Sequence, residues 1–324
     1  MQRRGILWSI PFLVTLGVAV LGTTALRLHT THTAATRKPA VLGAHTEQVA
    51  SDQAPLVVAP PVKTNDSQPA ILAKEAYLLD VASSYPLYAK NENEQVPIAS
   101  VTKLMTAVIA RKNYKLTDVA TTSKSAATIE GSKIDLRTGE TMDVQSLLTG
   151  LLIQSGNDAA MALAEHMGLE AFVAAMNEEA TYLGMKDTIY KDPAGLSDDA
   201  HSTAHDLGIL ASYVIRDDVI RSIVQTQQTS VTSADGSTKH VLQTSNRLIK
   251  PDHPLYVPEA TGLKTGFTPD AGHCLVASAS KNGRAIVTVI LHTDSTSTEA
   301  SAQEARKLLT WGLSTYSWDQ TDHN

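Results

Sequence analysis

Apolar residues recur at helical spacing in five stretches through the middle of the chain. In each stretch they stand at positions i, i+3 and i+4, which places them on one face of a helix. The stretches run from Ser100 to Arg111, Asp143 to Ile153, Asp158 to Met167, Leu169 to Leu183, and Ser202 to Ile215. The pattern therefore predicts helices that share a core, and a last helix is predicted at about Ser301 to Leu313.

Shorter apolar stretches with strand character lie on both sides of these helices. Before them, Glu75 to Asp80 and Pro86 to Lys90 predict a hairpin with a turn at Ser83-Ser84-Tyr85. After them, strands are predicted at Gln225 to Ser233, Thr238 to Thr244, Thr261 to Phe267, His273 to Ser280, and Ala285 to His292. The last two are joined by Asn282-Gly283, a strong signal for a tight hairpin turn.

Strands at both ends of the folded region, with helices between them, define the expected fold class. One antiparallel sheet would be built from the N- and C-terminal segments and flanked by helices, with an inserted helical subdomain. This architecture is an α+β sandwich. We expect residues 70–318 to form one catalytic domain, followed by a short polar tail at 319–324.

The N-terminus has the pattern of an export signal. Arg3 and Arg4 precede an uncharged apolar stretch from Gly5 to Leu26, which is long enough to cross a bilayer. Residues 1–26 are therefore expected to be a signal peptide or an N-terminal membrane anchor, since no strong Ala-x-Ala cleavage site follows. Both alternatives predict an extracytoplasmic protein, secreted or anchored to the outer face of the cytoplasmic membrane. Residues 27–69 are expected to be a flexible spacer.

Composition and charge exclude several classes of protein. The net charge is -6 and no block of basic residues is present, so nucleic-acid binding is not expected. The single cysteine, Cys274, excludes an intramolecular disulfide and a cysteine-rich zinc module, and is expected to be a buried core residue. His201 and His205 have the spacing of a metal-binding pair. The residues between them favour a helix cap that leaves His201 outside the helix, so no metal site is expected.

The first candidate for catalysis is the pair Ser100 and Lys103 at the start of a predicted helix. The two residues stand three positions apart, so they share a helix face with roughly 5–6 Å between Cβ atoms. A lysine that is partly buried and near another cation has a lowered pKa and can remove the serine proton as a free amine. The alternative for Ser100 alone is an ordinary helix N-cap. Ser278 and Lys281 have the same spacing but lie in a predicted strand, where they point to opposite faces.

Two further short motifs follow in order along the chain. Ser155-Gly156-Asn157 lies between two predicted helices, where Gly156 permits a tight connection that aims a hydroxyl and an amide at a common point. Lys264-Thr265-Gly266 lies on a predicted strand and is followed by Phe267, and a glycine on an inner strand lets a substrate backbone come close. Each triplet alone occurs by chance. The occurrence of all three motifs in this order, each in a suitable structural context, is a specific signal.

The order of the three motifs resembles the serine penicillin-recognising acyl transferases. Within that superfamily, the chain is similar to the low-molecular-mass penicillin-binding proteins that act as D-Ala-D-Ala carboxypeptidases, which implies a β-lactamase/transpeptidase-like fold. The resemblance covers the whole folded region. Supporting segments are Pro97-Ile98-Ala99, Met105-Thr106, Asp192 to Leu196, Ser202 to Leu207, Ala271 to Leu275, and Lys307 to Gly312.

The resemblance implies roles for three catalytic residues. Ser100 would be the nucleophile that becomes acylated, Lys103 its general base, and Ser155 a proton relay toward the leaving amine. The substrates would be peptidoglycan stem peptides, and β-lactams would be covalent inhibitors. No cofactor is implied.

The resemblance also implies a set of substrate-binding residues. Asn157 would hold the substrate amide, Lys264 would tune the proton network, and Thr265 would bind the terminal carboxylate. Gly266 and Phe267 belong to the same binding strand. The backbone N–H groups of Phe267 and of the nucleophile would form the oxyanion hole.

One departure from the family pattern concerns the substrate carboxylate. Many carboxypeptidases of this family have an arginine in the loop before the last helix, but Thr293 to Gln303 contains no cation. Carboxylate recognition would then depend on Thr265 and Lys264, or on Arg306 if the last helix begins earlier than predicted. The departure favours endopeptidase action on cross-links.

Three alternatives to a carboxypeptidase therefore stand beside it. The first is a D,D-endopeptidase that acts on cross-links. The second is a class A β-lactamase on the same fold, which needs a glutamate, usually in Glu-x-x-Leu-Asn, and no such string occurs in the chain. The third is a non-catalytic penicillin-sensing or wall-binding module, against which the intact serine, lysine and asparagine residues of the three motifs argue.

Overall fold

The computed structural model describes residues 58–65, 67–294 and 296–318. They belong to the second of two units into which the chain divides, Pro55–Asn324. The predicted signal or anchor segment at 1–26, most of the predicted spacer at 27–69, and the predicted tail at 319–324 lie outside the described residues.

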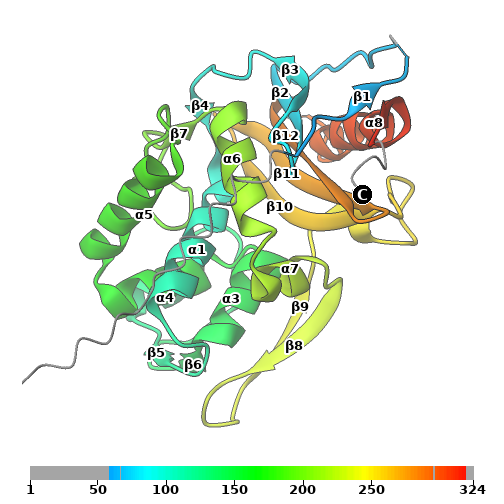
Figure 1. Cartoon of the computed structure of the whole chain (residues 1–324). Helices are drawn as coiled ribbons and strands as arrows, with labels where there is room; N and C mark the ends of the chain where they lie inside the picture. The colour runs from blue at the N-terminus through cyan, green and yellow to red at the C-terminus, as the bar shows by residue number, and fades with distance from the viewer. Residues whose placement is uncertain (1–57, 66, 295, 319–324) are drawn as a thin grey trace, which may run out of the picture. The chain divides into compact units, whose positions relative to one another are not determined.

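A five-stranded antiparallel sheet joins the two ends of the described chain (Figure 1). Its strands, in spatial order, are β10 (Ala260–Thr268), β11 (Gly272–Lys281), β12 (Arg284–Thr293), β2 (Glu75–Asp80) and β3 (Pro86–Lys90). The predicted antiparallel sheet from N- and C-terminal segments is therefore confirmed. One detail was wrong: β10, which carries Gly266, is the edge strand of the sheet and not an inner strand.

Helices cover both faces of the sheet, because side chains alternate along each strand. On β2, Leu78 packs in one apolar cluster with Leu308 and Leu309 of α8 (Ala300–Thr315). The neighbouring Tyr77 and Leu79 point to the opposite face and pack in the larger cluster of the helical subdomain. The α+β sandwich with inserted helices is confirmed, and in Figure 1 α8 lies on the side of the sheet away from α1, α3 and α4.

The helical subdomain contains all five predicted helices, with small shifts at their ends. They are α1 (Lys103–Asn113), α3 (Val144–Ile153), α4 (Asn157–Met167), α5 (Leu169–Leu183) and α6 (Ala204–Val214). A 3-10 turn, η1 (Ala99–Thr102), precedes α1. Two short helices, α2 (Lys124–Thr128) and α7 (Asp218–Val224), were not predicted, since neither is long enough to show a clear apolar period.

Helix α6 begins later than predicted, because the residues before it form a strand and a helix cap. The Thr203 side chain accepts a hydrogen bond from the backbone N–H of Asp206, so Thr203 caps the helix. Ser202 instead lies in β7 (His201–Ser202), which pairs with β4 (Val96–Pro97). The predicted start at Ser202 is therefore two residues early, and His201 lies outside the helix.

Two hairpin-like pairs lie apart from the central sheet. The first, β8 (Gln228–Thr232) with β9 (Lys239–Gln243), extends away from it and packs on α3 (Figure 1). The second pairs β5 (Val119–Thr121) with β6 (Thr141–Asp143), both in the helical subdomain. The strands of the first pair were predicted, but their separation from the central sheet was not.

The ordered structure begins before the predicted domain boundary at residue 70. Strand β1 (Val62–Lys63) pairs with β13 (Tyr316–Ser317), and the indole N–H of Trp311 donates to the carbonyl oxygen of Ser67 at 2.6 Å. The C-terminal part of the predicted spacer is thus bound to the C-terminal part of the domain. A second 3-10 helix, η2 (Arg247–Ile249), follows β9.

Within the described residues, no single helix combines the length and apolarity needed to cross a membrane. Only α4 and α5 taken together reach that length and apolarity, and they are bent by 97° relative to each other.

Candidate active site

A cleft lies between the helical subdomain and the edge strand β10, and six of the eight predicted site residues line it. They are Ser100, Ser155, Asn157, Thr265, Gly266 and Phe267. The other two, Lys103 and Lys264, are buried and hydrogen-bonded to serines of the cleft. The three motifs, far apart in the sequence, therefore meet in one place.

Ser100 lies in the 3-10 turn η1, directly before helix α1. Its hydroxyl accepts a hydrogen bond from the Lys103 ammonium at 2.8 Å. Lys103, the first residue of α1, also donates to the carbonyl oxygen of Ala194 at 2.6 Å and is fully buried. The N-cap position of α1 is Thr102, so Ser100 does not cap this helix.

Burial lowers the pKa of Lys103 well below its usual value. The positive charge of Lys264 lowers this pKa further, while the carboxylates of Asp192 and Asp158 oppose the shift. A lysine in this environment readily gives up its proton. The free amine can then accept the proton of the serine hydroxyl that it contacts.

Ser155 lies in the tight connection between α3 and α4. Its backbone is in the left-handed region, with φ of 64°, and the connection is completed by Gly156, the N-cap residue of α4. The Lys264 ammonium donates to the Ser155 hydroxyl at 2.8 Å and to the carbonyl oxygen of Thr265 at 2.8 Å. Burial lowers the pKa of Lys264 to about 7. Two serines thus each face a buried lysine with a lowered pKa.

Asn157, the first residue of α4, lines the cleft and has one unused side-chain acceptor. Its side-chain N–H donates to the carbonyl oxygen of Glu130 at 2.6 Å, and its backbone N–H donates to the carbonyl oxygen of Ser132 at 2.7 Å. The side-chain oxygen is buried and has no hydrogen-bond partner among the described residues. A buried acceptor is costly to leave unpaired, so this oxygen suits an amide N–H of a bound peptide.

The edge strand β10 forms the other wall of the cleft. A Cβ atom on Gly266 would lie 3.1 Å from the carbonyl oxygen of Ile98 and from the backbone nitrogen of Ser100, so glycine permits the strand to approach η1 closely. The hydroxyl of Thr265 contacts that of Ser245 at 2.6 Å. Phe267 is half exposed and stacks on His273, with 4.3 Å between the ring centroids.

The segment from Asp192 to Ser197 packs against the turn that carries Ser100. The Asp192 carboxylate accepts hydrogen bonds from the backbone N–H groups of residues 194 to 197. The segment also supplies the Ala194 carbonyl that holds Lys103, and the Pro193 carbonyl accepts from the Thr106 hydroxyl at 2.6 Å. Sequence reasoning found this segment only as a supporting match and missed its structural role.

Arg247 is a residue of the cleft that sequence reasoning missed. It begins the short helix η2 and lines the cavity together with Thr265. Its guanidinium donates to the carbonyl oxygen and the hydroxyl of Thr298, at 2.7 and 3.0 Å. No motif or periodicity marks this arginine, since it follows a hairpin whose placement the sequence did not predict.

Arg306 is not part of this cleft. It lies on α8 and lines a separate cavity beside Trp311 and Pro69. Helix α8 begins at Ala300, one residue before the predicted start, and the shift does not bring Arg306 to the site. The alternative in which Arg306 binds the substrate carboxylate is therefore wrong.

Within the described residues, no group of three or more His, Cys, Asp or Glu side chains could hold a metal ion. Cys274 lines the cleft floor but is fully buried, and burial raises the pKa of its thiol to about 12. Cys274 is therefore a poor nucleophile in this environment.

Comparisons with known proteins agree with this geometry. A family model described as D-alanyl-D-alanine carboxypeptidase matches residues 62–295. The D-alanyl-D-alanine carboxypeptidase DacF of Bacillus subtilis is 37% identical over 252 residues, which cover 75% of this chain and 63% of the relative. DacD of Escherichia coli is 33% identical, with 79% of this chain and 66% of the relative covered. The chain thus spans about two thirds or less of the length of these relatives.

Another relative and two solved structures extend the comparison. A D-alanyl-D-alanine endopeptidase of Escherichia coli is 31% identical, with 76% of this chain and 79% of the relative covered. The Streptomyces K15 DD-transpeptidase has a TM-score of 0.70 at 28% identity and covers 76% of this chain and 99% of its own. A putative penicillin-binding protein homolog from Mycobacterium tuberculosis has a TM-score of 0.72 at 26% identity, with 82% and 99% covered.

Proposed function

Because the chain belongs to the D-alanyl-D-alanine carboxypeptidase family, we propose that it is a serine D,D-peptidase acting on D-Ala-D-Ala ends of peptidoglycan stem peptides. The observation that carries the proposal is the contact of 2.8 Å between the Ser100 hydroxyl and the buried Lys103 ammonium. Lys103 has a lowered pKa, so it can serve as the base that activates Ser100.

The proposed reaction has two steps. In the first, Ser100 Oγ attacks the carbonyl carbon of the penultimate D-Ala, and its proton passes to the Lys103 amine. The C–N bond to the terminal D-Ala then breaks, and Ser155, in contact with Lys264, relays a proton to the leaving amine. In the second step, water attacks the ester and regenerates the Ser100 hydroxyl.

The substrate backbone is proposed to bind between Asn157 and strand β10. The unpaired side-chain oxygen of Asn157 accepts an amide N–H of the peptide. The backbone N–H groups of Ser100 and Phe267 stabilise the developing oxyanion, a contribution worth roughly 3–4 kcal/mol per donor in comparable sites. β-Lactams, which mimic the D-Ala-D-Ala amide, acylate the same serine.

Arg247 is proposed to receive the terminal carboxylate together with Thr265. Both residues line the cleft, and Ser245, two positions before Arg247, contacts the Thr265 hydroxyl. Thr298 holds the guanidinium by two hydrogen bonds to its side-chain nitrogens. A fixed guanidinium suits a planar carboxylate, so it replaces the arginine that the loop before the last helix lacks.

We expect Arg247→Ala to weaken hydrolysis of a stem pentapeptide, with the loss mainly in KM. The expected reduction in kcat/KM is roughly tenfold or more, since hydrogen bonds to charged groups contribute about 1.5–3 kcal/mol. Arg306→Ala is the matched control, because Arg306 lies in a different cavity and its loss leaves the kinetics unchanged. Equal effects of the two variants would exclude Arg247 as the carboxylate receptor.

The product distribution tests the proposed function directly. The protein is incubated with a stem pentapeptide and, separately, with a D-Ala cross-linked dimer, and the products are weighed by mass spectrometry. Loss of one D-Ala from the pentapeptide is the expected main reaction. One relative is named an endopeptidase, so cleavage of the dimer is the second candidate activity. Failure to cleave either substrate would contradict a peptidase of this kind.

The protein is also proposed to act outside the cytoplasm, secreted or anchored through its N-terminal segment. The support is the pair Arg3 and Arg4 followed by the uncharged stretch from Gly5 to Leu26. Cell fractionation with N-terminal sequencing distinguishes the two alternatives. A mature protein in the medium that lacks this stretch indicates a cleaved signal, and an intact N-terminus in membranes indicates an anchor. Recovery of intact protein from the cytoplasm contradicts both.

A further inference from the structure

The loop of residues 129–140, between α2 and β6, forms a wall of the cleft without any helix or strand of its own. Two of its residues, Gly131 and Ser132, line the cavity. Its first half is tied to Asn157, whose side-chain N–H donates to Glu130 and whose backbone N–H donates to Ser132. Since one side-chain N–H of Asn157 is bonded to this loop, the loop fixes the direction in which the Asn157 oxygen points.

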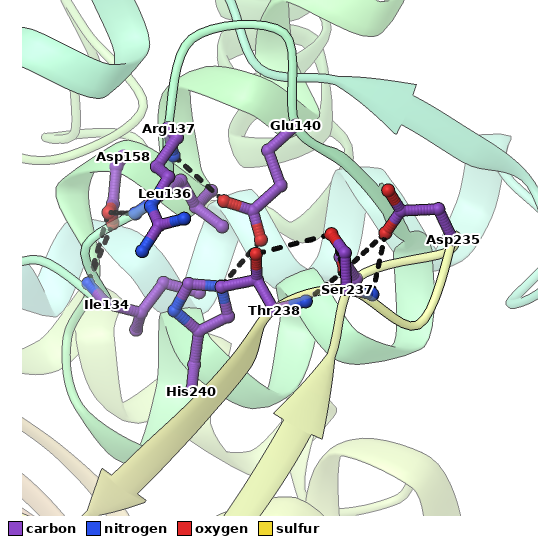
Figure 2. Close-up of polar contacts among 10 residues, drawn as sticks. Ile134, Leu136, Arg137, Glu140, Asp158, Asp235, Ser237, Thr238 and His240 are labelled. Carbon is purple, nitrogen blue, oxygen red and sulfur yellow. Dashed lines mark hydrogen bonds and ion pairs between the residues drawn. The ribbon is translucent and has the colours of Figure 1, made fainter.

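The middle of the loop is held by the neighbours of Asn157. The Gln154 side chain donates to the carbonyl oxygen of Lys133 at 2.7 Å. The buried Asp158 carboxylate accepts from the backbone N–H of Ile134 at 3.1 Å and from that of Leu136 at 3.0 Å, as Figure 2 shows. The corner between α3 and α4 thus holds the loop up to residue 136.

The far end of the loop is held by a different contact, between Glu140 and His240 (Figure 2). Glu140 Oε1 and His240 Nε2 are 2.6 Å apart, and each side chain is only 6% exposed. The second oxygen of the Glu140 carboxylate accepts the backbone N–H of Arg137 at 2.9 Å, so both carboxylate oxygens are used. A buried, fully bonded carboxylate is a rigid anchor, because either oxygen would be costly to leave unpaired.

His240 belongs to the strand that leads into the opposite part of the cleft. It lies on the buried face of β9 with Leu242, and the backbone N–H of Gln243 donates to the Gln154 side chain at 3.3 Å. Two residues after Gln243 the chain reaches Ser245, which lines the cavity. Glu140 and His240 therefore connect the loop on one side of the cleft to the strand that supplies the other side.

We propose that Glu140 and His240 form a positioning pair for the acylation site, an inference that rests on the proposed function. Neither side chain lines the cavity. The pair acts through the loop of residues 129–140, which orients the Asn157 amide, and through β9, which places Ser245. We expect loss of the pair to leave Ser100 and Lys103 in the cleft, to free the far end of the loop at residues 137–140, and to break its link to β9.

The test compares acylation rates of variants of the full chain with a fluorescent penicillin. Glu140→Leu and His240→Leu each remove the hydrogen bond between the two side chains. We expect the second-order rate constant of acylation to fall by about tenfold to a hundredfold, as small displacements at an active site commonly cause. Because the two residues act together, the double variant Glu140→Leu/His240→Leu is expected to lose no more than the worse single variant.

The double variant also guards against a folding artefact. Replacing both partners of this hydrogen bond by apolar groups leaves neither side chain unpaired. The backbone N–H of Arg137 loses its acceptor but lies in an exposed part of the loop, so this variant is expected to fold. His240→Gln keeps an N–H donor at this position and is expected to restore most of the rate. Glu179→Leu is the matched control, because Glu179 is also a buried carboxylate paired with a cation, Lys112, but lies on α5 away from the cleft.

The outcomes separate this inference from the proposed function. In all variants one penicillin is still expected to add to Ser100 at long times, only more slowly. The positioning role is overturned if the folded double variant acylates within about twofold of the parental rate, or if Glu179→Leu slows acylation as much. A parental protein that forms no adduct would instead contradict the proposed function itself.

Discussion

Two lysines, each in contact with a serine, are the centre of the proposed chemistry at the scale of single residues. Lys103 contacts Ser100, and Lys264 contacts Ser155, both at 2.8 Å. Burial is the largest cause of the lowered pKa of each lysine, and the charge of Lys264 adds to the effect on Lys103. The site therefore makes both amines easier to deprotonate than isolated lysines, which are fully charged at neutral pH.

This coupling predicts the effect of Lys264→Met on the pH dependence of acylation. Below a pH of about 7, Lys264 is protonated and disfavours a proton on Lys103. Removing that charge raises the pKa of Lys103, so more alkaline solution is needed to free the base. The acidic limb of the acylation rate, measured with penicillin from mildly acidic to mildly alkaline pH, is expected to move to higher pH. The control Lys112→Met, far from the site, leaves the limb in place.

A limb that stays in place or moves to lower pH in Lys264→Met would show that Lys264 does not act on Lys103 through its charge. A lower rate without a shift of the limb would assign Lys264 to proton relay through Ser155 alone. The pH position of the limb is therefore the informative quantity.

At the residue scale, the sequence predicted those site residues that belong to short, recognisable motifs. Ser100, Ser155 and Thr265 were chosen from short motifs, and the structure brings them to one cleft. Arg247 was not predicted, because a single arginine after a hairpin has no distinctive spacing. Glu140 was not predicted either, since its partner His240 is far away in the sequence and only the fold brings the two together.

At the scale of elements, close backbone contacts set the position of the nucleophile. Gly195 has a φ of 77°, and a Cβ atom on it would lie 2.0 Å from the carbonyl oxygen of Ala99, the residue before Ser100. The segment after Asp192 and the turn η1 therefore touch at a point where only glycine fits. Their contact fixes Ser100 relative to Lys103.

A pair of glycine substitutions isolates this contact. Gly195 and Gly283 have nearly the same positive φ, 77° and 76°, but a Cβ atom on Gly283 has no heavy atom within 4 Å. Gly283→Ala should therefore show only the cost of the left-handed backbone, about 1–2 kcal/mol. Gly195→Ala is expected to lose more stability in urea denaturation and to slow acylation of Ser100 by penicillin.

Equal losses of stability in the two glycine variants, with parental acylation in both, would mean that η1 moves freely away from the segment after Asp192. In that case the close contact would have no part in placing the nucleophile.

The predicted boundaries of helices and strands agree best with the structure where a local sequence signal marks them. Strands β2 and β3 and helix α5 begin and end where the apolar pattern predicts. The predicted helix at Ser100 divides into the 3-10 turn η1 and α1, because the close contact with Gly195 is a tertiary constraint that no local pattern records. Local propensity gives way to packing at such places.

At the scale of the described domain, the cleft forms where segments that are far apart in the sequence come together. The edge strand β10 comes from late in the chain, whereas η1 and α1 come from early in it. The alternation of strands and helices predicted the layers of the sandwich. It did not predict that β8 and β9 form a separate sheet that packs on α3. The strand pattern is the same whether these two strands belong to the central sheet or lie outside it.

The most direct test of the account is the mass of the intact protein after incubation with penicillin. We expect one covalent adduct in the parental protein, located on Ser100, and none in Ser100→Ala. Lys103→Ala is expected to fold and to acylate roughly a hundredfold to ten-thousandfold more slowly, as loss of a general base commonly causes. An adduct that persists in Ser100→Ala, or a parental protein that remains unmodified, would contradict the central claim that Ser100 is the acylated nucleophile.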